Sequence, residues 1–574
     1  MSVSRRGLLG GAMATAATGA VVLTRPEAAA AAGDVPTVGT FRTDVVIVGG
    51  GIGGVAAALG AVRTGATVLL TEETDWIGGQ FTTQLVPPDE HRWIEPSAGA
   101  YGQTASYRKL RAAVRDLYRA NYPVSAEFRA AGEPNPGAAW SSRLAADPAA
   151  WRACIWNLLM PHIATGRLQV LFQHRPVSAT VVRGRVLAIA FQGPDDATRF
   201  AIGSYFIDAT DLGELLPLTR ADHTIGREQG GPQSTGGTGE LSNPHPSADL
   251  MDQQAFTMVL AVGYSRTGGE HRIAKPASYA THLPTFHDFF ARNLFDPTRD
   301  HAYDAGPNFW QYRRIAALRS FTADSLLEEV GLLNFACNDF KSGALAGVDA
   351  VTKADNIRRA KELSLSMLYY LQNDVPRRDG SGTGYPALRL RPDVSGTLDG
   401  IAKAPYVREG RRLRSIARIF EWHVGVDNRV DRTGVADSKG AAAQFADSVG
   451  TGHYWLDIHA GARDSSGLWR RCYPYQIPLS ALIPTNVSNL LAGGKCLGTT
   501  HVTNGAYRVH PTEWNIGESA GIVAAFCMTK KTDPRTVQNS RMAELHTVLA
   551  GQGVSTSWPA SVRGSWQLPG SSAR

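Results

Sequence analysis

The chain has 574 residues, which is long for a single core, so we expect two intertwined domains. Its net charge is +7, but acidic and basic residues are mixed along it, and no basic run predicts a nucleic-acid partner. The five cysteines are scattered without a C-x-x-C pair. They predict neither a disulfide framework nor a zinc site, although an exported chain could form one bridge.

Residues 1–32 have the pattern of a twin-arginine signal peptide. Arg5 and Arg6 precede a weakly apolar stretch over 8–23, and the alanines at 28–32 offer cleavage sites. The order of these parts predicts export by the twin-arginine machinery, with the mature protein secreted or held in the cell wall or periplasm. The alternative is an uncleaved or disordered arm. No later apolar run reaches about 18 residues, so we expect no membrane span.

Residues 44–54 read DVVIVGGGIGG, in which an apolar run predicts a buried parallel strand. Three glycines after it fit the G-x-G-x-x-G pattern: Gly49, Gly51 and Gly54. Such glycines allow a tight turn, close approach to a pyrophosphate and close packing of the next helix. A second strand over 66–71 ends at Glu72, whose carboxylate can bind a ribose. The unit predicts a dinucleotide site, and the alternative is a glycine-rich turn without a ligand.

Two later segments predict the rest of this domain. Residues 167–214 contain strand patterns of a β-meander, and the last strand leads into a turn with Thr210 and Asp211. Residues 489–528 begin with a strand that ends in glycines and finish with a helix from Pro511. Because these segments are far apart in sequence, we expect the second domain to be inserted between them.

Together the motifs resemble FAD-dependent oxidoreductases of the two-dinucleotide-binding-domain type, in particular a bacterial and often exported group. The resemblance rests on the first glycine motif with Glu72 and on further blocks at 76–80, 208–211, 406–413, 475–479, 489–494, 500–502 and 508–512. The combination is specific to the family, although no block alone is.

The resemblance implies an α/β fold: a Rossmann-like FAD-binding domain with a parallel sheet and β-meander, plus an inserted mixed α+β substrate domain. We expect the FAD-binding domain over 41–90, 165–215 and 485–535. The substrate or cap domain is expected over 91–164 and 216–484, and a C-terminal tail over 536–574.

By the same resemblance, the glycines of the first turn contact the FAD pyrophosphate and Glu72 binds the adenosine ribose. Further expected cofactor residues are Gly79, Gln80, Thr210, Asp211, Gly494, Lys495 and Thr512. The helix from Pro511 would point its positive end at the flavin pyrimidine, where reduced flavin carries negative charge. Lys495 and His510 depart from the family pattern, so the resemblance does not carry a substrate over to this chain.

No second glycine motif of similar quality follows, so we expect no NAD(P)H domain and an organic substrate as electron donor. The expected chemistry is hydride transfer from a C–H bond next to O or N to flavin N5, while a base takes a proton. Electrons would then pass to O2 or another acceptor. The alternatives are a flavin-dependent isomerase or lyase without net oxidation, and a non-catalytic flavin-binding protein.

His510 is the first candidate for the base, because it stands at the start of the flavin-facing helix. The alternative is a cap or pocket histidine without a proton role. Arg508 could bind a substrate carboxylate, stabilise reduced flavin, or only pair with Glu513. The substrate, the acceptor, the oligomeric state and covalent attachment of FAD cannot be told from the sequence.

A second candidate cluster lies at 453–459, where strand alternation would place His453, Asp457 and His459 on one face. We include His459 among the candidate catalytic residues. Two histidines and one aspartate could suggest a metal, but without further ligands we expect none. The arginines at 408, 411 and 412 either recognise an anionic substrate or form a solvated face.

Overall fold

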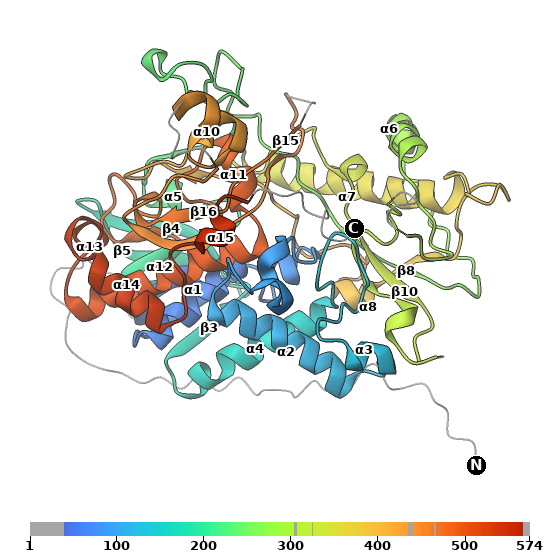
Figure 1. Cartoon of the computed structure of the whole chain (residues 1–574), viewed down its shortest axis with the longest axis horizontal. Coiled ribbons are helices and arrows are strands. Elements are labelled where there is room, and N and C mark those ends of the chain that lie inside the picture. The colour runs from blue at the N-terminus through green and yellow to red at the C-terminus, as the bar shows by residue number, and fades with distance from the viewer. Residues whose placement is uncertain (1–38, 303–306, 324, 434–439, 464–466, 566–574) are drawn as a thin grey trace. The chain divides into compact units, whose positions relative to one another are not determined.

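A mixed sheet of seven strands lies at the centre of the computed structural model, which describes residues 39–302, 307–323, 325–433, 440–463 and 467–565 (Figure 1). Its strand order is β3-β2-β1-β6-β5-β4, and β17 also pairs with β6. The strands are β1 (Thr40–Val48), β2 (Val68–Glu72), β3 (Leu168–Phe172), β4 (Arg175–Val182), β5 (Arg185–Gln192), β6 (Thr198–Asp208) and β17 (Leu490–Ala492). The signal-peptide prediction lies outside the described residues.

The sheet has the predicted parallel part and the predicted meander. Strands β1, β2, β3, β6 and β17 pair in parallel, whereas β4, β5 and β6 pair antiparallel as consecutive strands. Arg183 and Gly184 form the turn between β4 and β5 with positive φ angles of 49° and 71°. The α/β fold class, with its parallel sheet, is therefore confirmed.

A second, antiparallel sheet has the order β11-β8-β10-β9, and helices α6 and α7 pack on each other near it. Its strands are β8 (Leu260–Tyr264), β9 (Arg314–Ala316), β10 (Glu329–Leu333) and β11 (Leu388–Leu390). Short pairs complete the described strands: β7 (His223–Thr224) with β12 (Arg412–Leu413), β13 (Ser448–Gly452) with β16 (Tyr475–Pro478), and β14 (Leu456–Ile458) with β15 (Leu468–Arg470).

The described helices are α1 (Ile52–Arg63), α2 (Ala105–Asn121), α3 (Ala126–Ala130), α4 (Pro148–Ala164), α5 (Leu215–Leu218), α6 (Tyr279–Arg292), α7 (Ala350–Asn373), α8 (Pro392–Ser395), α9 (Glu421–Val424), α10 (Val426–Thr433), α11 (His501–Tyr507), α12 (His510–Lys530), α13 (Pro534–Ser540), α14 (Met542–Gly551) and α15 (Ala560–Arg563). In the part of the chain that the structure describes, no helix is long and apolar enough to cross a membrane.

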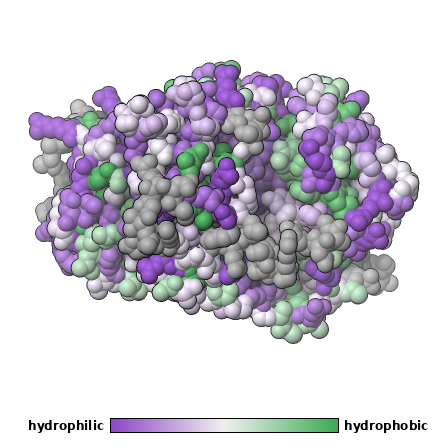
Figure 2. Space-filling model, turned by 45° about the horizontal axis from the view of Figure 1, so that its top comes forward, coloured by the Kyte–Doolittle hydropathy of each residue, from purple (hydrophilic) through white to green (hydrophobic). Residues whose placement is uncertain are grey.

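Two large groups of buried hydrophobic side chains correspond to the two sheets. Side chains of α2 and α4, which we expected in the substrate domain, belong to the group around the seven-stranded sheet. The end of the chain is also packed, because Trp558 is 5% exposed and donates to the Tyr475 carbonyl. On the face shown in Figure 2, hydrophobic residues form separate groups among hydrophilic ones. The domain boundaries themselves stay a prediction.

Helices α1 and α12 lie side by side against the sheet (Figure 1). A Cβ at Gly517 would lie 2.0 Å from the Gly53 carbonyl oxygen, and one at Gly521 would lie 2.0 Å from that of Ala57. The two backbones therefore touch where α12 carries glycine. The helix begins at His510, one residue before the predicted start, so Pro511 occupies its second position rather than its first.

Candidate functional site

The turns after three parallel strands meet at the first glycine motif. Gly49, with a φ of 99°, follows β1, and a Cβ on it would lie 2.5 Å from the Ala209 carbonyl oxygen after β6. A Cβ on Gly53 would lie 2.0 Å from the Gly493 oxygen after β17. Because the carboxyl ends of neighbouring parallel strands share one edge of a sheet, the three predicted segments converge there.

The block at 76–80 lies against the same turn. The Gly78 amide donates to the Gly50 carbonyl over 2.8 Å. A Cβ on Gly79 would lie 2.8 Å from the Gly51 Cα. Gln80 Nε2 donates to Glu513 Oε2 over 2.6 Å, so this block also reaches the first turn of α12. The predicted cofactor residues Gly79 and Gln80 therefore join the converging segments.

Glu72 ends β2 and is 9% exposed. Its Oε2 accepts from the Gly50 amide over 2.8 Å, and its Oε1 accepts from the Thr74 amide and hydroxyl over 2.9 and 2.8 Å. Burial, only partly offset by these hydrogen bonds, raises the pKa of Glu72 to about 7. The carboxylate thus holds the glycine turn, and its contact with a ribose stays a prediction.

Thr210 and Asp211 form the turn after β6. Thr210 Oγ1 donates to Asp208 Oδ1 over 2.7 Å and accepts from the Glu214 amide over 2.7 Å. Asp211 accepts from Gln84 Nε2 over 2.7 Å and pairs with Lys495 Nζ. The side chain of this aspartate is therefore tied to the segment after β17.

The segment after β17 supplies the other predicted contacts. A Cβ on Gly494 would lie 3.1 Å from Glu513 Oε1, and Lys495 Nζ donates to the Val407 carbonyl over 2.9 Å. Burial raises the pKa of Glu513 to about 7, although Lys495 opposes that shift. Thr512 Oγ1 lies 3.3 Å from the Tyr475 hydroxyl. Lys495 is therefore a buried cation between Asp211 and Glu513.

These residues fit the FAD that the resemblance implies. Gly51 caps α1 without a side chain, and the first turn of that helix contains no acidic residue, which suits an anionic pyrophosphate. A Cβ at Gly51 would meet only the Gly79 Cα, at 3.9 Å. Within the described residues, Gln80 Oε1 and Gln84 Oε1 are buried acceptors without a hydrogen bond, and ribityl or ribose hydroxyls would satisfy them.

His510 is fully buried at the start of α12. Its Nδ1 accepts from the Asp89 amide over 3.1 Å, so the ring carries its proton on Nε2, which lies 3.1 Å from the Val86 carbonyl. Burial lowers the pKa of His510 to about 3. Both ring nitrogens contact backbone groups of residues 86–89, so neither is available to a substrate. This geometry favours the alternative of a pocket histidine without a proton role over the role of base.

His459 has a different environment, since its side chain is 26% exposed. Its Nδ1 lies 2.5 Å from Asp339 Oδ2, whereas Nε2 lies 3.6 Å from Asp457 Oδ2, beyond hydrogen-bond distance. Thr257 Oγ1 donates to the other Asp339 oxygen over 2.5 Å, and Arg408 Nη2 lies 3.0 Å from that oxygen. Burial favours a raised pKa for Asp339, but Arg408 and His459 outweigh it and lower that pKa.

Arg508 connects His459 to the cofactor segments. It is buried, and its Nη2 donates to Asp457 Oδ2 over 2.9 Å and its Nη1 to the Tyr406 hydroxyl over 2.8 Å. Its carbonyl accepts from Gln80 Nε2 over 3.2 Å. Burial favours a raised pKa for Asp457, but His459 and Arg508 outweigh it and lower that pKa. Arg508 therefore pairs with Asp457 rather than with Glu513.

His453 lies apart from this cluster. Its Nε2 lies 3.2 Å from the Cys472 carbonyl, and its ring packs edge-on against Trp93 with centroids 5.0 Å apart. Burial lowers the pKa of His453 to about 4. The expected common face of 453, 457 and 459 is wrong for His453, because the chain between β13 and β14 at 453–455 is not a strand and does not alternate regularly. Among the described residues, no group of three or more potential ligands could hold a metal.

The sequence did not single out Asp339 or Thr257, and it included Tyr406 only in the block at 406–413, without a role. Asp339 follows β10 in a stretch without a motif, and only the fold brings it to His459. Arg408 and Arg412 are 2% and 0% exposed, so the solvated face considered for the arginines is wrong for these two. Arg412 pairs with Glu228 over 2.9 Å.

The chain matches the family described as “FAD dependent oxidoreductase” over residues 44–549. It is 35% identical over 107 residues to sarcosine oxidase subunit alpha from Corynebacterium sp. (strain P-1). That match covers 18% of this chain and 11% of the relative, so the similarity spans a small part of that protein's length.

Solved structures of other proteins are similar at low identity. E. coli quinol fumarate reductase FrdA is 11% identical, with a TM-score of 0.28 over 89% of this chain and 74% of that chain. The rebeccamycin biosynthetic enzyme RebC with reduced flavin is 15% identical, with a TM-score of 0.20 over 39% of each chain. At these scores the structures add no argument to the family match.

Proposed function

The chain belongs to the family of FAD dependent oxidoreductases, and we propose that it oxidises a small organic substrate at a C–H bond next to oxygen or nitrogen. FAD, when bound, supplies a two-electron acceptor at ring N5 for the hydride of that bond. The residues that would hold it are the glycine turn, Glu72, Gln80 and Lys495. The observation that carries the proposal is the partly exposed His459, oriented by Asp339 and connected to the cofactor segments through Asp457 and Arg508.

His459 is the proposed base. The Nδ1–H group of His459 donates a hydrogen bond to Asp339. Nε2 therefore keeps a lone pair, which takes the proton of the substrate O–H or N–H group. The positive charge that the imidazole then gains faces two carboxylates, those of Asp339 and Asp457.

Arg508 and Arg408 are the proposed positioning residues. Arg508 holds Asp457 at 2.9 Å, and Arg408 lies 3.0 Å from Asp339. Each arginine keeps its carboxylate charged, so both acids remain acceptors for the imidazole N–H groups. His510 keeps the backbone at 86–89 against α12 and exchanges no proton.

The twin-arginine pattern in residues 1–32 supports export, and the electrons pass to O2 or to another diffusible acceptor. This part of the proposal rests on the sequence alone. Release of peroxide in air would identify O2 as the acceptor.

The test is anaerobic mixing of the purified yellow protein with alcohols, amines and sugars. We expect one class to bleach the visible flavin band and to give the oxidised product in equal amount. Product without bleaching would instead support an isomerase or lyase. His459→Gln should slow bleaching, whereas His287→Gln, an exposed histidine on α6, should leave it unchanged. If bleaching is equally fast in the His459 variant, the base assignment is wrong.

A further inference from the structure

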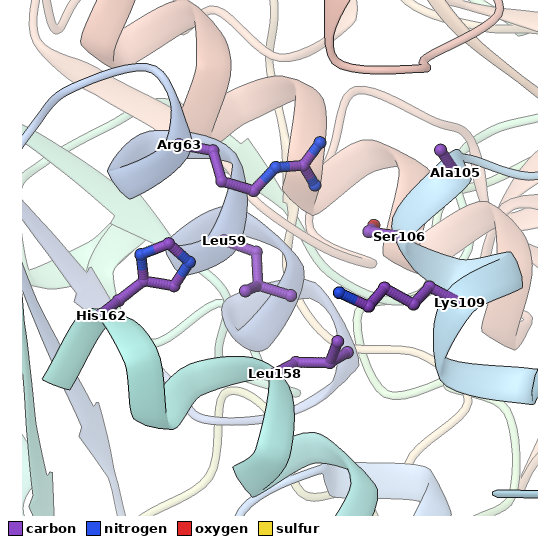
Figure 3. Close-up of a pocket in the computed structure, with 7 residues that line it drawn as sticks. All are labelled: Leu59, Arg63, Ala105, Ser106, Lys109, Leu158 and His162. Atoms are coloured by element: carbon purple, nitrogen blue, oxygen red, sulfur yellow. The ribbon is translucent and has the colours of Figure 1, made fainter. Parts of the chain in front are cut away.

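A pocket of about 290 Å³ lies between α1, α2 and α4 (Figure 3). Leu59 and Arg63, in the last turns of α1, form part of its wall. The glycine turn of the expected FAD site precedes the first residue of the same helix. Since an α-helix rises 1.5 Å per residue, about 15 Å of helix separates the pocket from that turn. The pocket is therefore a separate site.

Basic side chains from three different helices line the pocket: Arg63 from α1, Lys109 from α2 and His162 from α4. None of the residues that line it is acidic. Figure 3 shows Lys109 reaching from α2 toward α1, and Arg63 reaching in the opposite direction. Leu59 and Leu158 add apolar surface between these charged groups. The wall thus combines positive charge with a hydrocarbon surface.

Two of the three basic side chains have no partner within the described residues. Arg63 pairs with Glu518 over 3.0 Å and donates to the Gln552 carbonyl over 2.9 Å. In the described part of the chain, the side chains of Lys109 and His162 make no hydrogen bond or ion pair. Burial, followed by the positive charges of Arg63, Arg167 and Lys109, lowers the pKa of His162. The pocket therefore has a positive field without a matching anion.

The carboxylate that pairs with Arg63 does not neutralise this field. Glu518, on α12, is 0% exposed and accepts from Arg63, from Ser106 Oγ over 2.5 Å and from Trp514 Nε1 over 3.2 Å. Its two carboxylate oxygens accept from these donors, and Glu518 does not line the pocket. In the part of the chain that the structure describes, Lys109 has no counter-charge and the side chain of His162 has no hydrogen-bond partner.

We propose that this pocket binds a small organic anion. Its carboxylate or phosphate group contacts Arg63, Lys109 and His162, and its short hydrocarbon part packs on Leu59 and Leu158. Charge-assisted hydrogen bonds fix the head group, and burial of the apolar part adds affinity. The volume is at the lower limit of small-molecule sites, which favours a compact ligand. Binding requires neither the substrate nor turnover.

Calorimetric titration of the FAD-loaded protein at low salt tests this proposal. The probes are hexanoate, hexyl phosphate, hexanol and inorganic phosphate. We expect one of the two amphiphilic anions to bind at a single site, at least about tenfold more tightly than hexanol or inorganic phosphate, a difference of about 1.4 kcal/mol. The tighter of the two identifies the head group as carboxylate or phosphate. Equal binding of hexanol, or no binding of either anion, would overturn the proposal.

Variants separate the pocket from general charge effects. Lys109→Gln and His162→Gln should each weaken binding of the preferred anion by about fivefold, because each removes one contact with the head group. Arg108→Gln is the matched control, since the exposed Arg108 neighbours Lys109 on α2 but does not line the pocket. If Arg108→Gln weakens binding as much as Lys109→Gln does, the anion responds to overall charge and the site is refuted.

Discussion

His459 Nδ1 lies 2.5 Å from Asp339 Oδ2, although 120 positions separate the two residues in the chain. His459 follows β14, whereas Asp339 follows the antiparallel strand β10. The carboxylate is also held by Thr257 and by Arg408, so it is oriented before any substrate binds. The pair gives the imidazole one defined tautomer, which a base at this position requires.

Asp339→Asn should slow substrate oxidation by about a hundredfold to ten-thousandfold while leaving the FAD content unchanged. An amide at this position can donate to Nδ1 and would leave the imidazole proton on Nε2, where the lone pair is needed. Stopped-flow measurement of flavin bleaching in the absence of oxygen reports the rate. Asp355→Asn, an exposed aspartate paired with Arg358 on α7, is the control. A variant at 339 with the rate of this control would contradict the role of Asp339.

His510→Gln should change how stability depends on pH. Burial lowers the pKa of His510 to about 3 from an ordinary value of 6.5, so between these values the unfolded chain binds a proton that the native protein does not. The stabilisation by His510 is therefore complete above pH 6.5 and decreases by about 1.4 kcal/mol per pH unit as the pH falls. The wild type should exceed the variant in free energy of unfolding most at pH 7.5 and least at pH 5.

Urea unfolding at pH 7.5, 6 and 5 measures this difference. His287→Gln, which replaces an exposed histidine, is the control. A gap between the wild type and the His510 variant that stays constant over this range would show that His510 is not a buried neutral histidine.

Gly517→Ala should push α12 away from α1, because the new Cβ would lie 2.0 Å from the Gly53 carbonyl oxygen. We expect a loss of about 1 to 3 kcal/mol in the free energy of unfolding and weaker retention of FAD, since Gly53 belongs to the cofactor turn. Unfolding and FAD release during gel filtration report the two effects. Gly551→Ala is the control, because a Cβ there meets nothing within 4 Å. Equal stability of the two variants would contradict the close contact.

Lys495→Met should destabilise the protein by about 3 kcal/mol, because it leaves the charge of Asp211 without its buried cation. Glu513 would lose the same neighbour, and its already raised pKa should rise further. The free energy of unfolding and the FAD content of the purified variant are the measurements. Lys361→Met removes the cation of an exposed pair with Asp399 and should cost less than about 1 kcal/mol. Losses of equal size would show that Lys495 is not a buried counter-ion.

The cofactor segments were predictable from the sequence because each is a local pattern. The glycines from 49 to 54 directly follow β1, Glu72 ends β2, and the turn at 208–211 follows the end of β6. A strand followed by such a turn shows in the sequence. The start of α12 was predicted within one residue, since proline is favoured in the first turn of a helix.

The surroundings of the histidines were not predictable in this way. His510 is a plausible base by position, yet its two ring nitrogens bind backbone from residues more than 400 positions earlier. Strand alternation grouped His453 with His459, but residues 453–455 lie between β13 and β14 and belong to neither strand. Asp339 reaches His459 through tertiary packing, and no spacing in the chain indicates it.

The contact between α1 and α12 constrains the order in which the protein can be made. The partners of the first glycine turn include Gly493 and Gly517, so a nascent chain must be almost fully synthesised before that turn can close. A ribosome-bound fragment that stops before β17 would lack Gly493, so one side of the glycine turn would have no packing partner. We therefore expect cofactor uptake to be a late event in biogenesis. A chain truncated near residue 484 should bind no FAD and lack the yellow colour of the flavin.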